Sequence, residues 1–162
     1  MNKPFLIISI LAIGAIITLS YTTKKSAPMP VVTTETQTMC FYLRGADKAY
    51  LKLVVDSAGR ASGELATMPA QKDSMRGVLN GGITVVNGIE TFDGTYTNMA
   101  EGMNNIDQRL IRLTGTDAQI GYGEIVENPD GSYKYKDPST VNYSFSIPRV
   151  DCAAYDATRA QS

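Results

Sequence analysis

The chain has 162 residues, a formal net charge of −1, two cysteines and no histidine. Its 15 lysines and arginines are scattered among 16 acidic residues, so the sequence lacks the basic stripe typical of proteins that bind nucleic acid. Without histidine, the Ser-His-Asp and Cys-His catalytic arrangements and the usual zinc sites are excluded. We therefore expect no metal, no cofactor and no nucleic-acid partner.

The first 21 residues have the pattern of an export signal. A short cationic start with Lys3 is followed by an apolar run over residues 5–19 and then by Ser20 and Tyr21. The run of about 15 residues is shorter than the ~20 of a comfortable transmembrane helix and is typical of a signal-peptide core. Residues 1–21 are predicted to be a signal peptide cleaved before Tyr21 or an uncleaved N-terminal membrane anchor. Either alternative places the domain in the periplasm or cell envelope, secreted or membrane-anchored, with the membrane contacted only through this segment.

The remaining chain divides into three parts. Residues 22–38 are rich in Thr, Pro and Lys and are predicted to form a flexible linker. Residues 39–152 are long enough for one hydrophobic core and form the predicted β-domain. Residues 153–162 are small and polar and are predicted to be a disordered tail.

Within the predicted domain, apolar and polar residues alternate with a period of two. The alternation is clearest over residues 51–56, 61–66 and 141–147, and turn signals rich in Gly, Asn and Asp separate such segments. This pattern predicts a single antiparallel meander of eight or nine strands, each with one buried face. A sheet of that size must close on itself or pack against a second sheet. We expect a small closed barrel, with a β-sandwich as the alternative.

The two cysteines bracket the predicted domain. In an oxidising compartment, an even pair of cysteines is more often a disulfide than a redox or metal site. Cys40 and Cys152 are therefore predicted to form a disulfide, which joins the first and last strands where the barrel closes.

Several predicted strands carry glycine at inward positions, namely Gly63, Gly77, Gly94, Gly121 and Gly123. Glycine in a strand permits sharp coiling, so these residues are interpreted first as barrel corners. The alternative is that the missing side chains leave room for a ligand inside the barrel.

Two carboxylates interrupt apolar neighbourhoods and are the candidate catalytic residues. Glu101 lies between Met99 and Met103, and Glu124 precedes Ile125. If both faced one cavity, desolvation could raise the pKa of one carboxyl group and create an acid–base pair. The alternative is structural: Glu101 caps a loop, and Glu124 faces water or pairs with an arginine such as Arg109.

Two further motifs have a structural and a functional interpretation. Residues 128–132 resemble a calcium loop only in part, because the required run of oxygen ligands and the final glutamate are absent, so a hairpin turn is expected. Residues 133–136, Tyr-Lys-Tyr-Lys, are either an ordinary solvated strand or a surface for binding a partner.

Short motifs along the whole domain resemble a group of small uncharacterised exported proteins and lipoproteins of Gram-negative bacteria. The motifs are Cys40-Phe41-Tyr42, Lys72-Asp73-Ser74, Gly94-Thr95-Tyr96, Ala100-Glu101-Gly102, Gly121-Tyr122-Gly123-Glu124 and Val150-Asp151-Cys152. The resemblance implies export but carries over no catalytic residue, because no activity is established for the group. Many members carry a lipid-anchoring cysteine, whereas no cysteine closely follows the apolar run here.

These observations favour a non-enzymatic binding or structural protein of the cell envelope. Its ligand would be a small apolar molecule held in the barrel, or an envelope protein or glycan on its surface. The alternative is a carboxylate-based hydrolase acting on envelope glycans, with Glu101 and Glu124 in the acid and base roles.

Overall fold

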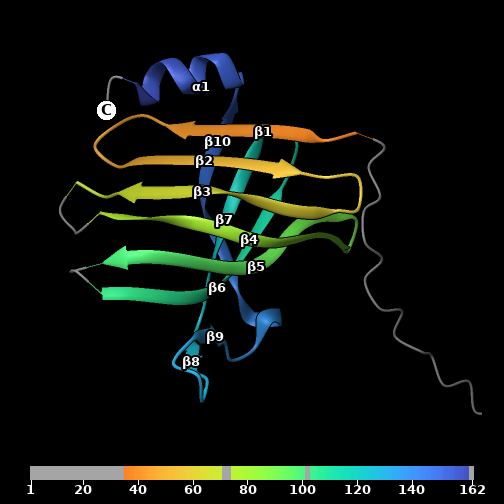
Figure 1. Ribbon diagram of the computed structural model, residues 1–162, viewed down its shortest axis with the longest axis vertical. Helices are drawn as coiled ribbons and strands as arrows, with labels where there is room; N and C mark the ends of the chain where they lie inside the picture. The colour runs from red at the N-terminus through yellow and green to blue at the C-terminus, as the bar shows by residue number, and fades with distance from the viewer. Residues whose placement is uncertain (1–34, 71–73, 101–102, 161–162) are drawn as a thin grey trace, which may run out of the picture.

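The computed structural model describes residues 35–70, 74–100 and 103–160. These segments contain ten strands, one short 3₁₀ helix and one α-helix (Figure 1). In chain order they are β1 Gln37–Leu43, β2 Lys48–Val55, β3 Arg60–Met68, β4 Met75–Val86, β5 Ile89–Ala100, β6 Met103–Leu113, β7 Asp117–Tyr122, β8 Ile125–Glu127, β9 Tyr133–Tyr135, η1 Pro138–Thr140, β10 Asn142–Val150 and α1 Cys152–Arg159.

The predicted export segment, residues 1–21, lies outside the described residues. The same is true of the predicted linker, except that its last residues belong to β1 or directly precede it. Among the helices that the structure does describe, none has the length and apolar character needed to cross a membrane.

Eight strands form a closed antiparallel ring in the order β1, β2, β3, β4, β5, β6, β7 and β10. The pairing of β5 with β6 and that of β10 with β1 complete the circle. The prediction of a closed barrel is therefore confirmed. Strands β8 and β9 stand outside the ring, where β9 pairs in parallel with β6 through Asp107 and Tyr133 (Figure 1).

Alternation along the strands fills the barrel with apolar side chains. In β2, Leu51, Leu53 and Val55 are buried, whereas Lys52 and Val54 between them are partly exposed. The corresponding positions of the other strands complete one continuous core. Its members are Met39, Phe41, Ala49, Leu51, Leu53, Val55, Ala61, Leu65, Leu79, Ile83, Phe92, Tyr96, Ile111, Leu113, Ala118, Ile120 and Ile147.

Glycines let neighbouring strands of the ring approach closely. Gly81 of β4 lies directly opposite Gly94 of β5, and a Cβ atom on either would collide with the backbone of the other strand. Cβ atoms on Gly63 and Gly77 would likewise meet the carbonyl groups of the adjacent strands. These glycines form tight corners, as the first interpretation held. They leave no room for a ligand, because backbone atoms already occupy the space.

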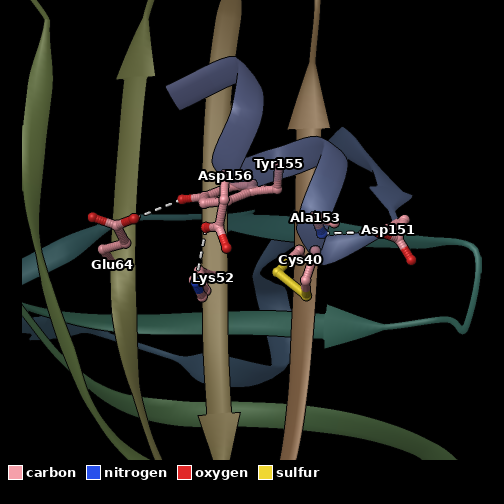
Figure 2. The surroundings of a disulfide bond; sticks show 8 residues. Cys40, Lys52, Glu64, Asp151, Ala153, Tyr155 and Asp156 are labelled. Atoms are coloured by element: carbon pink, nitrogen blue, oxygen red, sulfur yellow. Dashed lines mark hydrogen bonds and ion pairs between the residues drawn. A yellow bond between two sulfur atoms is a disulfide. The ribbon is translucent and has the colours of Figure 1, made fainter. Parts of the chain in front are cut away.

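The ladder between β1 and β10 is the shortest of the described ring. It contains two residue pairs, Cys40 with Val150 and Phe41 with Arg149. A disulfide between Cys40 and Cys152 spans this seam, with a Cα–Cα distance of 5.2 Å (Figure 2). The predicted bridge and its place at the closure of the barrel are confirmed. A structural disulfide fits an oxidising, extracytoplasmic environment.

The predicted disordered tail is wrong for residues 153–160, because most of that segment belongs to α1. Asp151 caps the helix by accepting a hydrogen bond from the backbone N–H of Ala153 at 2.8 Å. Tyr155 is buried against Tyr50 and Cys40 on the outer face of β1 and β2. The disulfide fixes the first residue of α1 to the barrel. Composition alone did not indicate these three anchors.

Polar contacts fix the same helix to β2 and β3. The Tyr155 hydroxyl donates to the Glu64 carboxylate at 2.7 Å, and Arg159 donates to the same carboxylate at 3.2 Å. Lys52 and Asp156 form an ion pair at 2.9 Å (Figure 2). Burial and the adjacent Glu64 raise the pKa of the Tyr155 phenol, so this hydroxyl remains a donor at neutral pH.

Removal of the disulfide should destabilise the barrel strongly. The bridge closes a loop with a sequence separation of 112 residues, and loops of that length contribute about 2–4 kcal/mol. We expect a Cys40→Ala/Cys152→Ala variant to lose about that much free energy of unfolding in urea titrations. Addition of a reducing agent should destabilise the native protein equally and leave the variant unchanged. An unchanged unfolding midpoint in the variant would show that the seam holds without the bridge.

Tyr155 should be the residue through which α1 stabilises the barrel. Truncation of a large buried aromatic side chain typically costs about 3–5 kcal/mol, so Tyr155→Ala should lower the free energy of unfolding by about that amount. The control is Asp156→Ala, which removes a largely exposed ion pair worth less than about 1 kcal/mol. Equal effects of the two substitutions in urea titrations would refute this role.

Candidate ligand-binding site at the barrel mouth

The two ends of the ring differ. At one end lie the β1–β2, β3–β4 and β5–β6 connections, the end of β7 and the start of β10. We call this end the mouth. A cavity of about 640 Å³ opens there, lined among others by Lys48, Thr67, Met75, Tyr122 and Phe145. Its volume falls in the range of about 300–1,000 Å³ that is usual for small-molecule sites.

The walls of this cavity are mainly apolar. Thr67 and Met75 are cross-strand partners on β3 and β4. Across the cavity, the rings of Tyr122 and Phe145 pack edge to face with centroids 6.4 Å apart. Phe145 also rests on the barrel core, whereas Tyr122 is 43% exposed. Large aromatic side chains that are only partly covered offer contact area to a ligand.

A hydrogen bond between the β1–β2 and β3–β4 connections stabilises the rim of the cavity. Asp47, in the turn between β1 and β2, accepts a hydrogen bond from the backbone N–H of Ala70 at 3.0 Å. Ala70 follows β3, so this bond joins the two hairpins that border the cavity. This part of the mouth is therefore preformed.

Polar side chains of β5 and β6 form a cluster on the mouth side of the core. Tyr96 pairs with Asp107 across the two strands, and Arg109 lies on the face of β6 that carries Ile111 into the core. Asn98, which is buried, donates from Nδ2 to Asp107 Oδ2 at 3.0 Å. We call Tyr96, Asn98, Asp107 and Arg109 the mouth cluster.

Arg109 is the least satisfied member of the mouth cluster. Its side chain is only 12% exposed, and its guanidinium lies 5.1 Å from the ring centroid of Tyr96. The nearest Asp107 oxygen is 3.7 Å from Nη2, which is too long for a good hydrogen bond. The buried Nε has no hydrogen-bond partner among the described residues. A buried donor left in that state costs about 1–3 kcal/mol.

Three tyrosines surround the Arg109 charge. Burial raises the pKa of Tyr96 to about 12, while the positive charge of Arg109 acts in the opposite direction. Burial likewise raises the pKa values of Tyr122 and Tyr135, again opposed by Arg109. All three phenols are therefore protonated and uncharged at neutral pH. Asp107 is the carboxylate that faces Arg109 in the described structure.

The shifted pKa of Tyr96 makes stability depend on pH in the alkaline range. An unfolded chain ionises tyrosine near pH 10, as its unperturbed pKa is about 10. The folded pKa is higher, so the folded state favours the neutral Tyr96 phenol. Its contribution to the free energy of unfolding is complete below about pH 10 and is lost as the pH rises through about 12. We expect the free energy of unfolding to fall across this interval, and to fall less steeply in Tyr96→Phe. Parallel curves for the two proteins in urea titrations would contradict the assignment.

The catalytic candidates are not brought together in the described structure. Glu101 lies outside the described residues. Glu124 lies between β7 and β8 with its side chain 67% exposed, and it forms an ion pair with Lys136 at 2.8 Å. This exposure fits the alternative interpretation of Glu124, although its partner is Lys136 and not Arg109. A carboxylate in solvent lacks the desolvation that would raise its pKa for acid catalysis.

The other two motifs also have structural roles. Residues 128–132 form the expected hairpin turn, in which Asp130 accepts hydrogen bonds from the backbone and hydroxyl of Ser132. In the part of the chain that the structure describes, no group of three potential metal-binding side chains occurs. Tyr135 is buried and donates to the carbonyl of Gly121 at 2.6 Å, so this tyrosine is not part of an open surface, whereas Tyr133 is partly exposed.

The mouth cluster was missed by the sequence interpretation, although a signal is present. Positions 105, 107 and 109 continue the inward alternation of Ile111 and Leu113, but they are Asn, Asp and Arg. A strand whose inward positions change from polar to apolar indicates a barrel that is polar at one end. The apolar lining is harder to find, because Thr67, Met75, Tyr122 and Phe145 come from four different strands.

No protein-family model, curated protein or solved structure matches this chain.

Proposed function

We propose that this protein is a non-enzymatic binding protein of the cell envelope that holds a small ligand in the mouth of its barrel. The observation that carries the proposal is the cavity of about 640 Å³ with its walls of Thr67, Met75, Tyr122 and Phe145. The disulfide and the predicted export segment support the extracytoplasmic location.

The packing of the barrel restricts where the ligand would bind. The interior beyond the mouth is occupied by the apolar core, in which Leu51, Leu79, Ile111 and Phe92 are completely or almost completely buried. A ligand deep inside the barrel would have to displace these side chains. The mouth needs no such rearrangement, because Met75 and Tyr122 are already partly exposed there.

The alternative, a carboxylate-based hydrolase, has less support. Such chemistry requires two carboxyl groups about 5–10 Å apart in one cleft. Glu124 is exposed and paired with Lys136, and it does not line the mouth cavity. Fold alone would not favour either function, because one barrel architecture serves many.

A charge placed in the apolar wall should abolish binding of an apolar probe. We expect N-phenyl-1-naphthylamine to bind the protein with increased fluorescence, and Met75→Asp to weaken this binding at least about tenfold, since burying an unpaired carboxylate is costly. The matched control is Val78→Asp on the same strand, where Val78 is 52% exposed on the outer face. Equal losses in both variants, or no binding to the unmodified protein, would refute the mouth as the site.

A further inference from the structure

We propose that the mouth is specific for a small amphipathic carboxylic acid, whose carboxylate is bound by Arg109 and whose apolar part lies against Met75, Tyr122 and Phe145. This inference rests on the proposed function, because it names the ligand class for the same cavity. It draws on the mouth cluster, which the proposed function did not use.

Arg109 has the properties of a group that awaits an acceptor. It is always charged, it carries five N–H donors, and only 12% of its side chain is exposed. Its Nε has no protein partner in the described part of the chain, and its Nη2 lies 3.7 Å from Asp107 Oδ2. A ligand carboxylate would accept hydrogen bonds from the planar guanidinium in the bidentate geometry that arginine favours.

The surroundings of Arg109 hold the guanidinium in place and leave its Nε without a hydrogen-bond partner among the described residues. The centroid of the Tyr96 ring lies 5.1 Å from the guanidinium carbon of Arg109. Asn98 donates to the Asp107 oxygen that also faces Arg109, which fixes the position of that carboxylate. Asp107 is thus a positioning residue for the guanidinium of Arg109.

Tyr122 connects the charged and apolar parts of the site. Its ring lines the cavity and packs against Phe145. Arg109 does not itself line the cavity, but β6 and β7 pair with Ile111 opposite Ile120, so the next inward positions toward the mouth are Arg109 and Tyr122. The neighbouring Tyr135 hydroxyl interacts with Arg109 and donates to the carbonyl of Gly121, the residue before Tyr122. A ligand with its acid group near Arg109 therefore places its apolar part along Tyr122.

The test compares ligands that differ only in the head group. Decanoic acid, decanol and decylamine are titrated into the protein at neutral pH by isothermal calorimetry, below their micellar concentrations. We expect decanoic acid to bind about tenfold or more tightly than decanol, which is the gain of one hydrogen-bonded charge pair, and decylamine to bind most weakly. This comparison needs no substitution, so it remains valid even if a variant folds poorly.

Two variants test whether Arg109 causes the preference for decanoic acid over decanol. Arg109→Gln should remove the advantage of decanoic acid over decanol, because the guanidinium that supplies the charged hydrogen bonds is lost. The control, Arg112→Gln, removes the same charge from the outer face of β6, where Arg112 stacks on Tyr143 at 3.8 Å. We expect this variant to keep the full preference for the acid. Thermal unfolding of both variants establishes that each is folded.

The outcomes separate the two proposals. If none of the three compounds binds, the proposed function itself fails. If decanol and decylamine bind as tightly as decanoic acid, the mouth binds apolar molecules but the carboxylate specificity is refuted. The same conclusion follows if Arg112→Gln, and not Arg109→Gln, removes the preference.

Discussion

The structure depends on the closure of one β-sheet on itself. Six of the ring's strand pairings join strands that are consecutive in sequence, and β7 pairs with β10. The pairing of β1 with β10 joins the two ends of the domain through two residue pairs. The Cys40–Cys152 bridge reinforces this shortest ladder, and α1 covers it from outside through Tyr155. A closed ring has no free edge between β1 and β10, which removes the surface on which sheets most readily aggregate.

Closure also determines where a ligand can bind. Once the ring is closed, inward side chains must fill it. The apolar core does so over most of the length of the barrel. The polar residues of β6, Asp107 and Arg109, remain at the mouth side of this core. At that end β6 pairs with β9, while its pairing with β7 is confined to Ile111–Leu113. The mouth therefore combines an apolar cavity with a charged group whose hydrogen bonding is incomplete.

The sequence predicts the architecture better than the site, for physical reasons. Alternation such as that of Leu51, Leu53 and Val55 reflects burial of one strand face, and the two cysteines fix where the meander closes, so the barrel and the bridge follow from local pattern. The helix α1 was missed because its stability comes from tertiary anchors, Tyr155 and the disulfide, and not from a strong helical pattern. Glu124 stood out by its apolar neighbours in sequence, yet it lies in the connection between β7 and β8 with its side chain in solvent. The cavity is assembled from five strands and two of their connections, and no local pattern records which strand ends meet.

The most direct test of the account is to locate a bound ligand. Nuclear magnetic resonance of the isotopically labelled protein during titration with decanoic acid would report on Met75 in the mouth and Met39 in the packed core separately. The account predicts large shifts for the Met75 methyl group and the rings of Tyr122 and Phe145, with Met39 nearly unchanged. Shifts centred on Met39, or on the exposed outer face around Val78, would contradict it.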